Sequence, residues 1–284
     1  MINYLFFFIS LLGIGFIFPI LSIFSIFSKT KKDIVYNNIR FIRYLFSFKL
    51  FRISKHDLST DPNIMYFCNH RSFTDFFVDT ILVRYSSKMI GRYLVLLLFP
   101  IFFLFARITN CGYFIKRTCN NNIEEFFNNI ETDRKKDKFN NILVYPEGTR
   151  RPYQVEACML RKGFIFHSYN MNLPIQLIIT KNKEDVIDEK NFVAKRNAKM
   201  YVYYSEVIYP DYKRYNRDEY YEYVQHMWNY SWKKVFKTEN LTVYSEINQT
   251  LIHNNNNYQQ PLFRLFKFII VFLYFLYIYI ISNF

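Results

Sequence analysis

Long uncharged apolar segments lie at both ends of the chain. Residues 1–28 contain no Asp, Glu, Lys, Arg or His, and residues 268–284 also carry no charged side chain. About 20 apolar residues are enough to cross a bilayer as a helix. The pattern predicts an N-terminal segment over residues 1–28, which either spans the membrane or turns back at Pro19, and a C-terminal transmembrane segment over residues 265–284.

Basic residues crowd the stretch that follows the first apolar segment. Residues 29–55 contain eight Lys and Arg side chains and one acid, Asp33. Such basic segments stay on the cytosolic side of a membrane. Apolar residues between the charges are typical of an amphipathic helix on an anionic membrane surface, although a solvated helix has a similar pattern. We therefore expect a membrane-surface helix over 29–58 and an integral membrane protein whose central domain faces the cytosol, at the endoplasmic reticulum if the source is eukaryotic.

The middle of the chain alternates short apolar runs with helical stretches. Four runs have the length and composition of strands: 64–68, 142–145, 173–179 and 199–208. Residues 120–138 and 217–237 have helical spacing. Strands separated by helices predict an α/β domain, with a mixed central sheet flanked by helices, over 59–250 and a linker over 251–264. The apolar run 93–106 is shorter than a membrane span and fits either a core helix or a second membrane contact.

Composition and charge narrow the classes of function. Of the 284 residues, 51% are hydrophobic, which excludes a disordered chain. A net charge of +14 suits an anionic membrane surface, a phosphorylated substrate or nucleic acid. No nucleic-acid-binding motif is present, so we expect no nucleic-acid partner. The four cysteines form no CxxC pair and no His lies at zinc-finger spacing, so we expect no metal site.

Three short motifs carry the candidate chemistry: NHRSFTD at 69–75, GYFIKR at 112–117 and YPEGTR at 145–150. If His70 lies in the turn after a strand and Asp75 in the first turn of a helix, the carboxylate can hold one ring nitrogen. The other nitrogen is then free to take a proton from a hydroxyl. This is the His–Asp part of a catalytic triad without a protein nucleophile.

Arginine and glycine in the later motifs suggest anion binding. The planar guanidinium groups of Arg117 and Arg150 fit phosphate oxygens. Gly148 allows a sharp backbone turn that can bring amide donors to an anion. Glu147 is unusual beside an anion unless it orients Arg150 or a substrate hydroxyl.

Together the motifs resemble the NHxxxxD, GxxxxR and PEGTR pattern of the glycerophospholipid acyltransferase family, which includes the 1-acyl-sn-glycerol-3-phosphate acyltransferases. The resemblance covers about residues 60–210. It implies that His70 is the general base, that Asp75 orients it, and that Arg117 binds the acceptor phosphate. The acceptor-binding residues that it implies are Gly112, Lys116, Arg117, Glu147, Gly148, Thr149 and Arg150.

The family resemblance also implies a reaction. A fatty acyl group would pass from acyl-CoA, a co-substrate, to the free hydroxyl of lysophosphatidic acid in the membrane, giving phosphatidic acid without a further cofactor. Lysophosphatidylinositol, lysocardiolipin and glycerol 3-phosphate remain alternative acceptors, and a carrier protein remains an alternative donor. A membrane-anchored binding protein without activity is less favoured, because all the motif residues are present.

Overall fold

A mixed β-sheet organises the part of the chain that the computed structural model describes, which is residues 2–14, 39, 42–92, 110, 112–115, 123–136 and 141–247. Eight strands within these residues form one sheet in the order β10–β1–β9–β6–β2–β5–β3–β4, and β7 and β8 pair separately. Their bounds are β1 Lys49–Arg52, β2 Met65–Cys68, β3 Ser87–Arg92, β4 Gly112–Ile115, β5 Asn141–Val144, β6 Ile175–Lys181, β7 Ile187–Asp188, β8 Val193–Ala194, β9 Lys199–Ile208 and β10 Ser245–Glu246.

The centre of the sheet is parallel. In β2, Met65 lies opposite Ile142 of β5 on one side and Ile175 of β6 on the other, and both pairings are parallel. β3 pairs in parallel with β4 and β5, and β1 with β9. The β6–β9 and β1–β10 pairs are antiparallel. The predicted mixed sheet is therefore confirmed.

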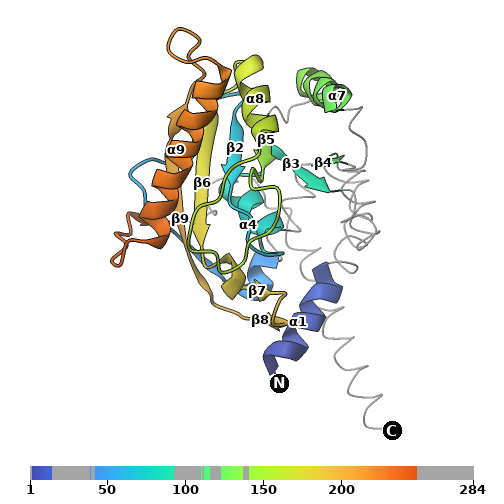
Figure 1. Ribbon diagram of the computed structural model, residues 1–284. Helices are drawn as coiled ribbons and strands as arrows, with labels where there is room; N and C mark the ends of the chain where they lie inside the picture. The colour runs from blue at the N-terminus through green and yellow to red at the C-terminus, as the bar shows by residue number, and fades with distance from the viewer. Residues whose placement is uncertain are drawn as a thin grey trace, which may run out of the picture. The chain divides into compact units, whose positions relative to one another are not determined.

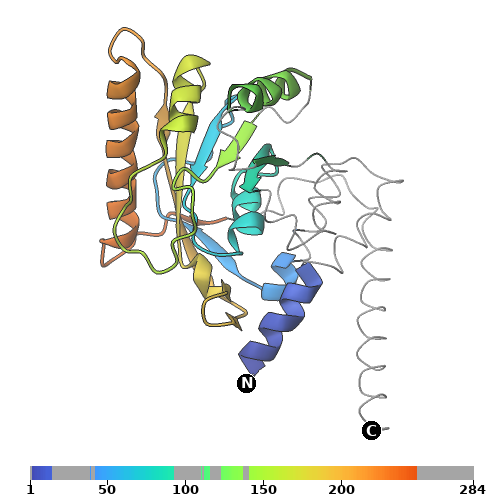
Figure 2. The same cartoon turned by 45° about the vertical axis from the view of Figure 1, so that its right-hand side comes forward.

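Helices cover both faces of this sheet. Their bounds are α1 Ile2–Leu12, α4 Asp75–Leu82, α7 Ile123–Lys136, α8 Lys162–Asn170 and α9 Arg217–Phe236, with a 3₁₀ turn, η3, at Lys183–Asp185. α8 and α9 pack on one face, and α4 lies on the other (Figure 1, Figure 2). The hydroxyl of Tyr204 in β9 donates to the carbonyl oxygen of Leu82, which ties α4 to its face of the sheet.

Burial on both faces explains why the central strands read as unbroken apolar runs. Met65 and Phe67 of β2 belong to the core beneath α8 and α9, together with Trp228. Tyr66 and Cys68 alternate with them and are buried on the side of α4. All four β2 side chains are buried.

The strands and helices predicted with the clearest patterns are confirmed. The four apolar runs form β2, β5, β6 and β9, and the two helical stretches form α7 and α9. α9 starts at a capping box: Asn216 accepts from the backbone amide of Glu219 at 3.0 Å, and Glu219 accepts from that of Asn216 at 2.7 Å. The strands that the sequence pattern does not predict are β1, β3, β4, β7, β8 and β10.

The predicted membrane-surface helix over 29–58 is wrong for Lys49–Arg52, which form β1. Leu50 in β1 is 0% exposed and lies opposite Met200 of β9. The sheet buries alternate apolar positions of this basic stretch, so pairing with β9 outweighs local helical preference. Residues 42–46 are helical. The sheet domain thus begins before the predicted boundary at residue 59.

The predicted membrane segments are described only in part. α1 covers the beginning of the N-terminal segment. Residues 15–38, the run 93–106 and everything after Ile247, including the predicted linker and C-terminal segment, lie outside the described residues. Within the described ranges, no helix combines the length and the apolar character that crossing a membrane requires.

Candidate active site

His70 and Asp75 lie where the spacing of the first motif predicts. β2 ends at Cys68, His70 follows in the loop, and Asp75 is the first residue of α4. His70 Nδ1 is 2.6 Å from Asp75 Oδ2. The same carboxylate oxygen accepts from the backbone amides of Arg71 at 2.7 Å and Ser72 at 3.2 Å. The predicted contact between the two side chains is therefore confirmed.

The surroundings of His70 keep its ring neutral. The imidazole stacks on Tyr145, with ring centroids 4.3 Å apart and 19° between the planes. Burial lowers the pKa of His70 below its usual 6.5, although the carboxylate of Asp75 acts in the opposite direction. When Nδ1–H donates to Asp75, Nε2 of the neutral ring keeps its lone pair. His70 is thus able to accept a proton at neutral pH.

A buried lysine, Lys183, supports Asp75 through its other oxygen. Lys183 Nζ is 3.4 Å from Asp75 Oδ1 and 2.7 Å from Asp79 Oδ2, and all three side chains are 0% exposed. Nζ also donates to the carbonyl oxygen of Asn69 at 2.7 Å. Burial raises the pKa of Asp75, but Lys183 and the hydrogen bond to His70 outweigh burial and hold that pKa below its usual value. The carboxylate beside His70 is therefore ionised.

Asp79 completes this buried group of charges. It follows Asp75 by four residues on α4, so both carboxyls lie on one helix face. Burial and the charge of Asp75 raise the pKa of Asp79 to about 7, against the effect of Lys183. Burial lowers the pKa of Lys183, but the two carboxylates raise it more. Lys183 therefore stays charged, and Asp79 is the carboxyl that takes up a proton near neutrality.

Sequence reasoning missed Lys183 and Asp79. Lys183 is one of 37 basic residues and lies 114 residues from Asn69 along the chain, so no local spacing connects them. One signal was present: Asp75 and Asp79 share the face of a helix that is otherwise mostly apolar. Two buried carboxylates require a cation or a proton from elsewhere in the fold.

The third motif forms a turn against the first. Gly148 has φ 72°, a conformation that glycine adopts without a steric penalty. Its backbone amide donates to the carbonyl oxygen of Tyr145 at 3.0 Å, which closes the turn, and the amide of Arg151 donates to the carbonyl oxygen of His70 at 2.8 Å. The sharp turn predicted at Gly148 is confirmed, and it lies beside the loop that carries His70.

Glu147 is buried next to His70 and is only 2% exposed. Burial raises the pKa of this carboxyl to about 8, although the backbone amide of His70 acts in the opposite direction. Glu147 is therefore mostly protonated at pH 7. A neutral carboxyl is a hydrogen-bond donor as well as an acceptor, and it does not repel an anion.

Arg150 is held close to the first motif. Its guanidinium carbon lies 4.2 Å from the ring centroid of Phe73. Nη1 lies 2.7 Å from Glu189 Oε1 in a partly exposed ion pair. The third motif therefore brings the guanidinium of Arg150 beside the first motif, but in this structure a carboxylate already pairs with it.

Of the remaining predicted site residues, the structure describes Thr149 and Gly112 but not Lys116 and Arg117. Thr149 is half-buried beside Arg150. Gly112 begins β4, where an added Cβ would come 3.1 Å from the carbonyl oxygen of Met89, closer than most side chains tolerate. Lys116 and Arg117 lie outside the described residues, so their approach to His70 stays a prediction.

The described residues contain no group of three or more His, Cys, Asp or Glu side chains placed to hold a metal ion.

Cys68, which directly precedes the first motif, is fully buried, and burial raises its pKa well above the usual value. A buried thiol in its protonated form is a poor nucleophile. The arrangement therefore supports general-base chemistry by His70 rather than a covalent intermediate on Cys68.

Comparison with known proteins agrees with the geometry. Residues 51–180 match the family model named Acyltransferase, a range that begins in β1, ends in β6 and contains all three motifs. A comparison with curated protein sequences gave no match. The fold is similar to the crystal structure of the 1-acyl-sn-glycerophosphate (LPA) acyltransferase PlsC from Thermotoga maritima. The two share 17% sequence identity with a TM-score of 0.63, over 84% of this chain and 97% of that one.

The matched range includes the residues that build the site. His70, Asp75 and Glu147–Arg150 fall inside it, whereas Lys183 follows its end by three residues. At this sequence identity the likeness to PlsC shows a shared fold. The family match covers less than half of the chain, and together with the motifs and their arrangement in the structure it supports an acyltransferase domain over residues 51–180.

Proposed function

We propose that this protein is an acyltransferase that moves a fatty acyl group from acyl-CoA to the free hydroxyl of lysophosphatidic acid, which yields phosphatidic acid. The observation that carries the proposal is the 2.6 Å contact between His70 Nδ1 and the ionised Asp75. This contact leaves Nε2 of a neutral ring available as a base. The structural neighbour PlsC is a 1-acyl-sn-glycerophosphate acyltransferase, which supports a 1-acyl-glycerophosphate acceptor.

In the proposed reaction, His70 Nε2 removes the proton from the acceptor hydroxyl while its oxygen attacks the thioester carbonyl carbon. A C–O bond forms, and the resulting tetrahedral intermediate carries the negative charge on the former carbonyl oxygen. The C–S bond then breaks, and the departing CoA sulfur takes the proton back from the imidazolium. Asp75 stabilises that imidazolium through the Nδ1 hydrogen bond. No acyl group is attached to the protein at any stage.

Arg150 is the described residue best placed to bind the acceptor phosphate. A phosphate would replace Glu189 as its partner, because a guanidinium binds two phosphate oxygens with charge-assisted hydrogen bonds. Arg117 and Lys116 would add positive charge, as the family pattern implies. Glu147 would donate a hydrogen bond to an acceptor oxygen, since it is mostly protonated at pH 7.

The reaction suits a membrane-attached protein. Lysophosphatidic acid resides in the bilayer and acyl-CoA approaches from the cytosol, so the active site has to lie at that boundary. The uncharged residues 1–28 and the basic stretch after them support an integral membrane protein with its catalytic domain on the cytosolic side. In a eukaryote this would be the endoplasmic reticulum membrane.

An acceptor panel tests the proposed substrate. Membranes that contain the expressed chain are given labelled oleoyl-CoA with lysophosphatidic acid, lysophosphatidylinositol, lysocardiolipin or glycerol 3-phosphate, and lipid products are separated and counted. We expect phosphatidic acid as the main product, above the level in membranes without the chain. A higher rate with another acceptor would show that this acceptor is the substrate instead of lysophosphatidic acid. Transfer from acyl carrier protein but not from acyl-CoA would show that the carrier protein is the donor.

A further inference from the structure

The hairpin of β7 and β8 carries an exposed aromatic residue at its tip. Phe192 is 54% exposed and has φ 55°. A positive φ is uncommon for a bulky side chain. Its ring contacts two rings of α1, Phe7 at 5.7 Å and Phe8 at 6.4 Å between centroids. The hairpin tip and α1 therefore form one surface.

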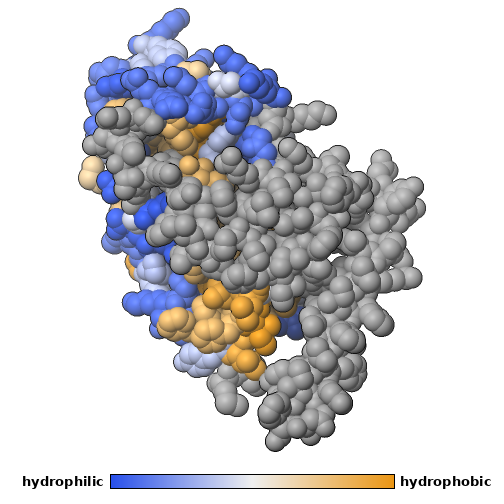
Figure 3. Space-filling view, turned by 90° about the vertical axis from the view of Figure 1, so that its right-hand side faces the viewer, coloured by the Kyte–Doolittle hydropathy of each residue, from blue (hydrophilic) through white to orange (hydrophobic). Residues whose placement is uncertain are grey.

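That surface is apolar over a wide area. Five large α1 side chains are more than half exposed, namely Tyr4, Leu5, Phe8, Ile9 and Leu12. Leu5, Phe8, Ile9 and Leu12 form with Phe192 what we term the apolar patch. Hydrophobic side chains gather at the end of the molecule where α1 lies (Figure 3). Clusters of exposed large apolar side chains mark sites of contact with proteins or membranes.

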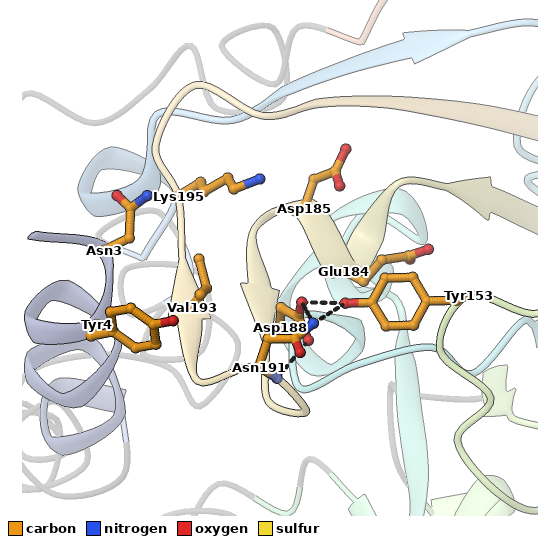
Figure 4. A pocket seen from close by; sticks show the side chains of 9 residues that line it. All are labelled: Asn3, Tyr4, Tyr153, Glu184, Asp185, Asp188, Asn191, Val193 and Lys195. Carbon is orange, nitrogen blue, oxygen red and sulfur yellow. Dashed lines mark hydrogen bonds between the residues drawn. The ribbon is translucent and has the colours of Figure 1, made fainter. Parts of the chain in front are cut away.

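The charges around the apolar patch favour a lipid surface. Lys190, Lys195 and Arg196 are exposed within four residues of Phe192. The acidic residues of the hairpin are engaged within the protein. Asp188 is hydrogen-bonded to Tyr153 and Asn191 at the wall of a pocket between α1 and the hairpin, which has a volume of about 450 Å³ (Figure 4). Glu189 is paired with Arg150.

We propose that the tip of this hairpin inserts, together with α1, into the interface of an anionic phospholipid bilayer. An aromatic and aliphatic patch with a basic rim is the pattern that binds such an interface. The uncharged sequence continues from α1 through residue 28, so the apolar patch adjoins the segment expected in the membrane.

The hairpin also reaches the active site. Glu189 follows β7 directly, pairs with Arg150 and accepts from the backbone amide of Phe73 at 3.4 Å. Phe73 lies between His70 and Asp75 in the first motif. The hairpin that contacts lipid thus also contacts the first and third motifs, at Phe73 and Arg150. This inference rests on the proposed function and adds the surface that holds the site against the bilayer.

Fluorescence of Phe192→Trp tests the insertion without relying on activity. The full chain is reconstituted in nanodiscs of phosphatidylcholine and phosphatidylserine, with and without brominated acyl chains. The native Trp228 and Trp232 are 0% and 1% exposed, so difference spectra against wild type report the new residue. Tyr230→Trp on α9 serves as the matched control, because Tyr230 is 45% exposed on the helix that covers one face of the sheet.

We expect a blue-shifted emission at position 192 that brominated lipids quench strongly, and water-like, unquenched emission at position 230. The quenching at 192 should weaken when phosphatidylcholine replaces phosphatidylserine. Water-like emission at both positions would overturn the inference. A blue shift at 192 without bromine quenching would overturn it too, since another part of the chain would then cover the patch. If an active enzyme lacks quenching, the hairpin inference alone fails; if quenching occurs without transfer to any acceptor, the proposed function alone fails.

Discussion

Asp75→Asn is expected to lower kcat for acyl transfer by about 10²–10⁴-fold with little change in the fold. Asparagine has nearly the same shape and can still accept from the amides of Arg71 and Ser72, which now bond to Asp75. It lacks the negative charge that stabilises protonated His70, and its amide can hold the imidazole in the wrong tautomer. The measurement is kcat and KM for lysophosphatidic acid, with circular dichroism as the check on folding.

Asp79→Asn provides the matched control for this variant. Asp79 is the other carboxyl partner of Lys183, at 2.7 Å, and we place no contact between it and His70. The variant Asp79→Asn should therefore reduce kcat far less than Asp75→Asn does. Equal losses in the two variants would mean that Asp75 acts through the buried charge group rather than on the imidazole.

The pH profile gives a second readout of the same pair. His70 must be neutral to act as a base, so kcat/KM falls as the pH drops through its pKa. Burial places that pKa below 6.5 in the wild type. The acid limb of the profile, where kcat/KM declines, should therefore lie below pH 6.5. Asp75 raises the pKa of His70, so Asp75→Asn should move the limb to lower pH. A limb that stays in place would show that Asp75 does not set the protonation of the base.

Lys183→Met is expected to lower the free energy of unfolding by about 3–5 kcal/mol, the usual cost of leaving a buried charge without its partner. Asp75 and Asp79 are 0% exposed, and Lys183 is the cation that contacts both. Without it both carboxyls have raised pKa values in the folded state. The lost stability should therefore be partly regained at low pH and become larger as the pH rises through those values.

Urea unfolding of the wild type and of Lys183→Met at several pH values, followed by tryptophan fluorescence in detergent, measures the loss of stability and its pH dependence. Trp228 and Trp232 report unfolding because both are buried in the core beside α8. The double variant Lys183→Met/Asp79→Asn removes one of the two unpaired acids and should recover part of the stability. A loss below about 1 kcal/mol that does not depend on pH is what an exposed ion pair would give. Such a result would contradict the buried interaction of Lys183 with Asp75 and Asp79.

The clearest local signals predicted the centre of the fold. β2 and β5 are buried on both faces, so their sequences are short unbroken apolar runs, and the helices that cover them have helical spacing. β1 was missed because Lys49 and Arg52 made the stretch resemble a membrane-surface helix, and the strand depends on a partner about 150 residues away, at Met200. β3 and β4 do not show a regular alternation of apolar and polar residues. They are strands because they pair with neighbouring strands in the folded protein.

The site was predictable where its residues lie close in sequence. The contact of His70 with Asp75 follows from a strand end, a turn and a helix start, which the pattern indicates. The support from Lys183 and the pairing of Arg150 with Glu189 join segments that are distant in the chain. Neither contact follows from sequence spacing, since each depends on how η3 and the β7–β8 hairpin fold back onto the first and third motifs.

Acyl transfer by the wild-type chain and by His70→Ala, measured in the same membranes with oleoyl-CoA and lysophosphatidic acid, decides whether this site carries the reaction. His226→Ala, at an exposed position of α9, is the control for the loss of a histidine. We expect phosphatidic acid from the wild type and the control, and a rate about 10²–10⁴-fold lower from His70→Ala. Transfer by His70→Ala at the wild-type rate would contradict the assignment of His70 as the base.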